Sequence, residues 1–167
     1  MISRSKIPLI LQIFLFLIPM NVYVIGDWIG AGIQWIFLRY IQAIGKNGII
    51  LLYREIGFVI SGVLSGRSAI ASLLWAAGAA LIIIATILII YGTVKTDSTF
   101  IKKAAFVNIA GAVLFALSVF LQYGILLHGP AGIAIPFGIP VLLIIAFWQY
   151  RISCSMKDDP GTTADSS

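Results

Sequence analysis

Apolar residues occur in long, uninterrupted stretches along this chain. Three stretches contain no Asp, Glu, Lys or Arg, and they are Ile7–Gly26, Ser68–Val94 and Ala104–Tyr150. A helix needs about 20 mainly apolar residues to cross a bilayer core that is about 30 Å thick. The first two stretches therefore predict one membrane span each, and the third is long enough for two.

The third stretch contains the sequence HGPAG at residues 128–132. Glycine and proline interrupt helices, so we expect the chain to turn there. The predicted spans are about 7–26, 69–94, 104–127 and 133–150. Pro136 and Pro140 lie near the start of the last span and predict a kinked or irregular segment.

The segment 27–66 is amphipathic instead of uniformly apolar. On a helical wheel, residues 27–46 place Ile29, Ile33, Ile36, Phe37, Tyr40, Ile41 and Ile44 on one face; Asp27, Gln34, Arg39, Gln42 and Lys46, with Trp28 and Trp35, lie on the other. After the turn at 45–48, residues 49–66 divide in the same way, with Arg54 and Glu55 on the polar side. This pattern predicts an amphipathic helical hairpin over 27–66.

Two placements of this hairpin are open. If it lies on the outer membrane surface, the protein has four spans; if both helices cross, it has six. Antiparallel packing would bring Arg39 and Arg54 to a similar level, and Glu55 would neutralise one of them, because an unpaired charge in a membrane is costly. We favour the surface placement by a narrow margin.

The composition agrees with a membrane protein, since 60% of the 167 residues are hydrophobic and only 10% are charged. A soluble protein usually has about 25% charged residues. The predicted fold class is an all-α integral membrane protein: a helical bundle of four spans plus an amphipathic helical hairpin, or six spans if the hairpin crosses.

Positive charge predicts which side of the membrane each end occupies, because cytoplasmic loops are enriched in Lys and Arg. With four spans, one side collects Arg4, Lys6, Lys95, Lys102, Lys103, Arg151 and Lys157. We therefore expect a multi-pass protein of the cell membrane with both termini in the cytoplasm. The N-terminal apolar run lacks a small-residue cleavage site, which favours an uncleaved anchor over a removed signal peptide. The polar tail, 151–167, is expected to be disordered.

Small and polar residues recur along the predicted span 104–127 at steps of three and four, a spacing typical of helix packing in membranes. They are Ala104, Asn108, Gly111, Phe115, Ser118 and Gln122. Packing explains this stripe better than a transport pathway does. Asn108 and Gln122 stand out as helix-packing polar residues, because a carboxamide in lipid needs a hydrogen-bond partner.

Charged residues outside the cytoplasmic group are the candidates for a binding site. Arg39, Arg54 and Arg67 suit phosphate or carboxylate contacts, with Glu55 as a base or orienting partner. The simpler interpretation is that the arginines anchor the hairpin to lipid headgroups. No residue is assigned a catalytic role, and whether the protein is an enzyme stays open.

Motifs of hydrolases, NTPases and metal sites do not occur, and Cys154 is the only cysteine, so the sequence indicates no cofactor and no metal site. The basic residues flank the spans, where anionic lipid explains them better than nucleic acid does. The expected function is that of a subunit of a membrane complex, or of a small oligomeric transporter or channel. The alternative is a membrane-embedded enzyme or binding site for an anionic lipid-linked substrate. The expected partners are membrane lipids, with further copies of the chain or other membrane subunits.

Overall fold

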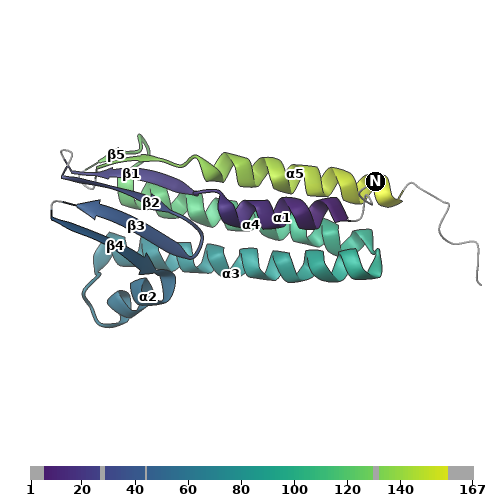
Figure 1. Ribbon diagram of the computed structural model, residues 1–167, viewed down its shortest axis with the longest axis horizontal. Helices are drawn as coiled ribbons and strands as arrows, with labels where there is room; N and C mark the ends of the chain where they lie inside the picture. Colours follow the sequence, from purple (N-terminus) through teal and green to yellow (C-terminus); the bar gives the residue numbers. More distant parts are fainter. Residues whose placement is uncertain (1–5, 27–28, 44, 130–131, 158–167) are drawn as a thin grey trace, which may run out of the picture.

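The computed structural model describes residues 6–26, 29–43, 45–129 and 132–157, which form five helices and six strands. In chain order these are α1 (Ile7–Leu17), β1 (Asn21–Ile25), β2 (Gly30–Gln34), β3 (Leu38–Ala43), β4 (Lys46–Leu51), α2 (Leu52–Ile60), α3 (Gly66–Lys95), α4 (Ser98–Tyr123), β5 (His128–Gly129), β6 (Gly132–Ile135) and α5 (Gly138–Lys157). The molecule is elongated, with a helical bundle along its length and a sheet beside one half of the bundle (Figure 1).

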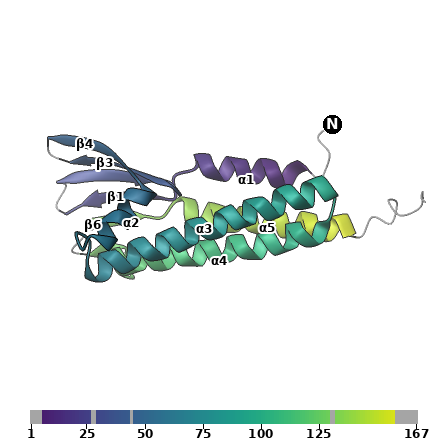
Figure 2. The same ribbon diagram turned by 90° about the horizontal axis from the view of Figure 1, so that it is seen from below.

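Helices α3 and α4 are the longest elements and lie antiparallel along the bundle. At about 1.5 Å per residue, the 30 residues of α3 extend about 45 Å. Helices α1 and α5 pack beside this pair at the end that carries the N-terminus and the α3–α4 turn, as both views show (Figures 1 and 2). One end of the molecule is therefore entirely helical.

Small residues allow α3 and α4 to approach closely. A Cβ atom added at Gly78 would lie 2.8 Å from the Phe115 ring and 3.3 Å from the carbonyl oxygen of Gly111. All members of the α4 stripe except Gln122 are buried against neighbouring helices: Ala104, Asn108, Gly111, Phe115 and Ser118. Close backbone approach of this kind is how membrane helices gain packing contacts.

The six strands form one antiparallel sheet in the order β4-β3-β2-β1-β6-β5. The strands run along the long axis of the molecule, next to the half of α3 and α4 that α1 and α5 leave uncovered (Figures 1 and 2). Helix α2 follows β4 directly and contacts α3. One face of the sheet therefore packs on helices and the other faces outward.

The sheet shows that the predicted all-α fold class is wrong. The segment 27–66 is not an amphipathic helical hairpin, because its described residues form β2, β3, β4 and the short helix α2. The alternative with six helical spans is wrong for the same reason. Asp27, Trp28 and Ile44 of the predicted helical faces lie outside the described residues.

The physical reason for this error is the residue content of the segment. Glycine occurs at positions 30, 32, 45 and 48, and each glycine inside a helix costs about 1 kcal/mol relative to alanine. Isoleucine is frequent there and favours strands. Gly45 has a φ of +76° at the β3–β4 turn, a conformation that glycine adopts without strain. Residues of the predicted apolar helical face come from two strands and the turn between them, because Ile33 lies in β2, Ile36 in the turn and Tyr40 in β3.

Prolines set where two of the apolar helices end or begin. Helix α1 stops at Leu17 because Pro19 disfavours helical geometry at the residue before it; the chain then enters β1, within the predicted span 7–26. Helix α5 begins at Gly138, after Pro136, and Pro140 lies in its first turn, where its missing N–H is not needed. It continues to Lys157, so the first part of the expected tail is helical, whereas residues 158–167 lie outside the described residues.

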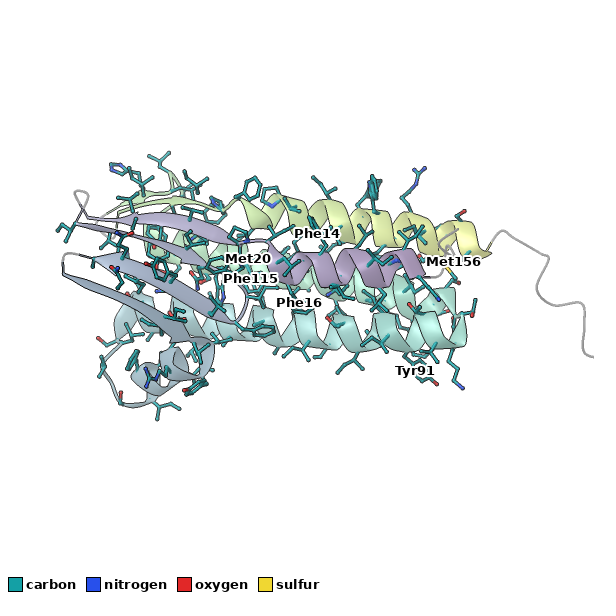
Figure 3. The ribbon with its side chains drawn as sticks, in the orientation of Figure 1. Phe14, Phe16, Met20, Tyr91, Phe115 and Met156 are labelled. Carbon is teal, nitrogen blue, oxygen red and sulfur yellow. The ribbon has the colours of Figure 1, made fainter. Side chains whose placement is uncertain are left out.

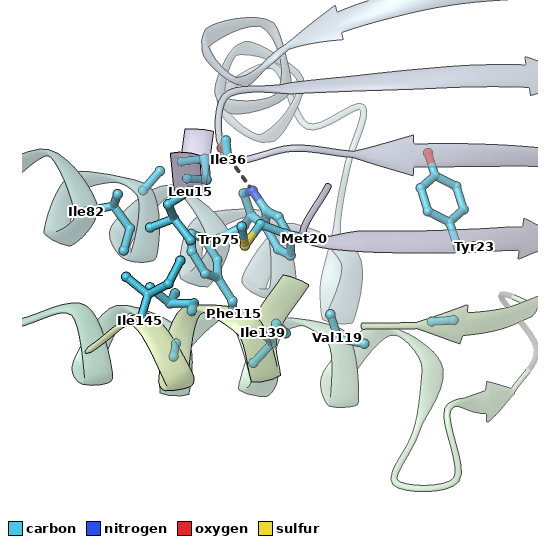
Figure 4. Close-up of a cluster of buried hydrophobic side chains, with 14 of the residues drawn as sticks. Leu15, Met20, Tyr23, Ile36, Trp75, Ile82, Phe115, Val119, Ile139 and Ile145 are labelled. Atoms are coloured by element: carbon cyan, nitrogen blue, oxygen red, sulfur yellow. Dashed lines mark hydrogen bonds between the residues drawn. The ribbon is translucent and has the colours of Figure 1, made fainter. Parts of the chain in front are cut away.

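The hydrophobic core lies where the sheet meets the bundle. Trp75 and Phe115 pack with their ring centroids 4.5 Å apart, and the Trp75 indole donates a hydrogen bond of 3.1 Å to the carbonyl oxygen of Ile36 at the β2–β3 turn (Figure 4). Leu15 of α1 and Met20 before β1 complete the contact, and both are fully buried. This cluster fixes the sheet on the helices.

Of the helices that the structure describes, three are long and apolar enough to cross a membrane, namely α3, α4 and the Gly138–Met156 part of α5. Helix α1 is apolar but has only 11 residues, so it extends only about 16 Å. Along the helices, large apolar side chains project away from the bundle, as Tyr91 does (Figure 3). This surface matches a lipid environment.

Candidate functional site

Arg39 and Glu55 form an ion pair between the sheet and α2. The Arg39 Nη2 atom lies 2.6 Å from Glu55 Oε1, and the two side chains are 15% and 6% exposed. Because α2 begins directly after β4, Glu55 falls in its first turn, where the helix dipole favours a carboxylate. Each buried charge is therefore neutralised by the other, and removal of either one would leave an unpaired charge.

The sheet surrounds this ion pair with further polar groups. Asn21, Gln34 and Arg39 are neighbours in one row across β1, β2 and β3. Asn21 and Gln34 are buried, with 1% and 4% exposure. Tyr23 is two residues after Asn21 on the same strand and therefore on the same face. The helix-facing side of the sheet thus holds a compact polar cluster, which we call the sheet cluster: Asn21, Tyr23, Gln34, Arg39 and Glu55.

Tyr23 lies at the centre of the sheet cluster. The Tyr23 ring packs over Gly32 of the neighbouring strand. A Cβ atom added at Gly32 would overlap the atoms of the ring, so only glycine fits there. The Arg39 guanidinium lies 5.5 Å from the ring centroid. Burial raises the pKa of Tyr23 from its ordinary value of 10.0 to about 12; the nearby Arg39 charge opposes this rise and the Glu55 charge adds to it.

Several polar atoms of the sheet cluster have no partner within the described protein. They are both amide atoms of Asn21, the Tyr23 hydroxyl and the Arg39 Nε atom. Buried polar atoms in native proteins nearly always make hydrogen bonds, to protein or to another polar group. The sheet cluster therefore offers donors and acceptors that suit water or a small polar molecule.

The four charged residues that the sequence singled out do not converge on one site. Arg39 and Glu55 meet, as described. Arg54 is exposed on α2, next in sequence to Glu55 but on another side of the helix. Arg67 is exposed in the first turn of α3 and lines a separate hollow with Gln122 and His128. Hence Arg39 is already balanced by a carboxylate, while the other two arginines remain accessible.

A second polar cluster joins the helices at the other half of the bundle, and we call it the carboxamide cluster. Asn108 of α4 donates to Gln12 of α1 at 2.9 Å and to Gln149 of α5 at 2.8 Å. Gln149 donates to Gln12 at 3.0 Å, and Gln12 donates to Thr86 of α3 at 3.0 Å. The three carboxamides are fully buried. Each of the three carboxamides is hydrogen-bonded. The carboxamide cluster therefore connects four helices and leaves none of these buried amide groups without a partner.

Sequence reasoning did not assign roles to Asn21, Tyr23, Gln12 or Gln149. A signal for the two glutamines was present, because each is a carboxamide inside a charge-free stretch and needs a partner as Asn108 does. No such signal existed for Asn21 and Tyr23, since their burial depends on the sheet. Gln122, in contrast to Asn108, is only partly buried at the end of α4.

Within the described ranges, no three His, Cys, Asp or Glu side chains gather in a way that could hold a metal ion. No protein-family model matches the chain, and no curated protein matches it in a sequence search.

Proposed function

We propose that this protein is a subunit of a membrane assembly and that it associates through its sheet, by pairing of the edge strand β4. The three long apolar helices cross the membrane, with α1 packed beside them. The sheet then lies at one membrane surface and provides the contact between subunits. The partner is a second copy of the chain.

The distribution of charge supports a placement with the helical end in the cytoplasm. Among the described residues, that end carries Lys6, Lys95, Lys102, Lys103 and Arg151. Lys and Arg are enriched on the cytoplasmic side of membrane proteins. In this placement both ends of the chain are cytoplasmic and the sheet is on the opposite side.

An apolar row across the outward face of the sheet is the observation that carries the proposal. Cross-strand pairing aligns Ile135, Val22, Ile33, Tyr40 and Ile49 side by side. Ile49 and Ile135, at the two ends of the row, are each 61% exposed. An open sheet cannot lie in hydrocarbon, because its edge strands carry unpaired backbone groups. Lipid therefore explains exposed side chains on the helices but not this row, which suits a protein contact.

The position of β4 favours a second copy as the partner. β4 is an edge strand of the sheet and carries Ile49 at its centre. An edge strand pairs readily with an identical strand in antiparallel orientation, which generates a two-fold interface. Such a contact continues the sheet and covers Ile49 in both subunits.

The interior of the described bundle favours an assembly role over transport through one protomer. Trp75 and Phe115 fill the space between the sheet and the helices, and the carboxamides of the other half are hydrogen-bonded to one another. A site for an anionic lipid-linked substrate built from Arg39, Arg54, Glu55 and Arg67 has less support, because Arg39 is paired with Glu55 and the exposed arginines lie on separate helices.

The substitution Ile49→Lys tests the proposal in the purified, detergent-solubilised protein. Light scattering coupled to size-exclusion chromatography should show a dimer for the natural chain and a dissociation constant raised at least about tenfold for the variant, since burying an isoleucine contributes about 1.5 to 3 kcal/mol. Ile60→Lys is the matched control, because Ile60 is an isoleucine that is 81% exposed at the end of α2, outside β4 and outside the apolar row. A natural chain that stays monomeric at all concentrations, or equal behaviour of the two variants, contradicts the proposal.

A further inference from the structure

A hollow of about 440 Å³ lies where the start of α3, the end of α4 and β5 meet. Its polar lining residues come from all three elements: Arg67 and Ser68 from α3, Gln122 and Tyr123 from α4, and His128 from β5. The hollow thus brings the start of α3 together with the end of α4 and β5, which lie much later in the sequence. It lies at the end of the spanning helices opposite Lys95.

Among the described residues, no acidic side chain balances the positive charge of Arg67 in this hollow. The two acidic side chains in the described part of the chain are Glu55, which pairs with Arg39, and Asp97, which accepts a hydrogen bond from the Thr99 N–H at the far end of α3. Neither is available to Arg67. The N-cap residue of α3, Ser65, makes no side-chain cap hydrogen bond, so the first-turn N–H groups add a partial positive charge beside Arg67.

Apolar side chains stand on the two loops that flank the hollow. Ile125 and Leu126 follow Gly124, a lining residue, and are 88% and 87% exposed. Val63, on the loop before α3, is 72% exposed. A cationic hollow with an apolar border matches a molecule that carries a negative group on an apolar chain.

We propose that this hollow binds the phosphate group of an anionic membrane lipid. Arg67 contacts the phosphate, Ser68 and Gln122 donate hydrogen bonds, and His128 closes the side formed by β5. Arginine suits this role because its planar guanidinium donates two parallel hydrogen bonds to phosphate oxygens. In the proposed placement the hollow lies on the membrane side that carries the sheet, and basic pockets between membrane helices are suited to anionic lipid headgroups. The site does not depend on the proposed dimer.

The test uses the full chain in nanodiscs of mixed phosphatidylcholine and phosphatidylglycerol, with retained lipid identified by native mass spectrometry. The natural chain should retain phosphatidylglycerol in preference to phosphatidylcholine. Arg67→Ala should lower that retention about tenfold, the size expected for a hydrogen bond to a charged group. The matched control is Arg54→Ala, which removes an exposed arginine that does not line the hollow. His128→Ala should also lower the retention, and thermal unfolding of each variant shows whether it is folded.

Three outcomes would overturn the proposal. The first is no lipid preference in the natural chain. The second is an equal loss in the Arg67→Ala and Arg54→Ala variants, which indicates general attraction of charge instead of a site. The third comes from a parallel titration of the lipid-free protein with inorganic phosphate: binding that depends on Arg67 without any lipid would assign the hollow to a free anion.

Discussion

At the scale of single residues, burial of polar side chains between apolar elements is the main feature of this molecule. The carboxamide cluster is complete in itself, whereas the sheet cluster leaves several polar atoms without a protein partner. The first arrangement is typical of a structural connection and the second of a hydrated or ligand-binding site. The two clusters should therefore respond differently to substitution.

Asn108→Ala should destabilise the protein by about 1 to 2 kcal/mol, because it removes the two hydrogen bonds that Asn108 donates and the longer one that it accepts from Gln12, and leaves Gln12 and Gln149 with fewer buried partners. The measurement is thermal unfolding in detergent. Val113→Ala, at a half-exposed position on the same helix, serves as the control and should change stability much less. Equal effects of the two substitutions would mean that the carboxamide cluster does not hold the helices together.

The stability of the folded protein should fall at high pH, because burial of Tyr23 makes its phenol harder to ionise in the folded chain than in the unfolded chain. Below pH 10 the phenol is protonated in the folded and the unfolded chain. Between pH 10 and about 12 the unfolded chain releases the proton while the folded chain retains it, so stability falls as the pH rises through this range. Ultraviolet absorbance of tyrosinate, compared between the natural chain and Tyr23→Phe, should place the Tyr23 transition near pH 12. A difference spectrum that appears near pH 10 would show that the phenol is not buried.

At the scale of elements, the sequence predicted the long helices well and the sheet not at all. Charge-free stretches identify α3 and α4 because an apolar run long enough to cross a bilayer has few other structures available. Strands β1 to β4 pair with their neighbours in the chain, and β1 also pairs with the distant β6. Such strands are short, and short apolar runs do not separate strand from helix. The glycines at 30, 32, 45 and 48 were the local signal that argued against a helix there.

The same limit applies to the candidate site. Arg39 and Glu55 were identifiable as costly charges in an apolar setting, and that cost predicted that Glu55 would neutralise either Arg39 or Arg54; the structure pairs it with Arg39. Asn21 and Tyr23 join them only because β1 lies beside β2 in the sheet. Which residues belong to the sheet cluster therefore depends on how the strands pair, and the sequence pattern alone did not reveal that pairing.

Gly78→Ala tests the close contact between α3 and α4. The added methyl group meets the Phe115 ring at 2.8 Å, so the helices must separate or the ring must move, at an expected cost of about 1 to 3 kcal/mol in unfolding free energy. Gly57→Ala in α2 is the matched control, because its methyl group meets no atom within 4 Å, and it should be neutral or stabilising. Thermal unfolding in detergent distinguishes them. A Gly78→Ala variant as stable as the natural chain would show that the helices are not packed at this point.

At the scale of the whole molecule, the elongated shape separates two environments. One end combines helices with basic residues, and the other carries the sheet, the sheet cluster and the hollow beside Arg67 (Figure 1). With strands in place of the expected helical hairpin, the described part of the chain has no fourth helix that is both long and apolar enough to cross a membrane. In the proposed placement, the sheet lies at the membrane surface opposite the basic end.

Cysteine accessibility in intact cells tests this arrangement most directly. In a chain with Cys154→Ser, Asn47→Cys marks the sheet and Thr96→Cys marks the α3–α4 turn; both positions are exposed. A membrane-impermeant maleimide should label position 47 in intact cells and position 96 only after the membrane is opened. Labelling of both positions from the same side, or of position 47 only after the membrane is opened, would contradict the account.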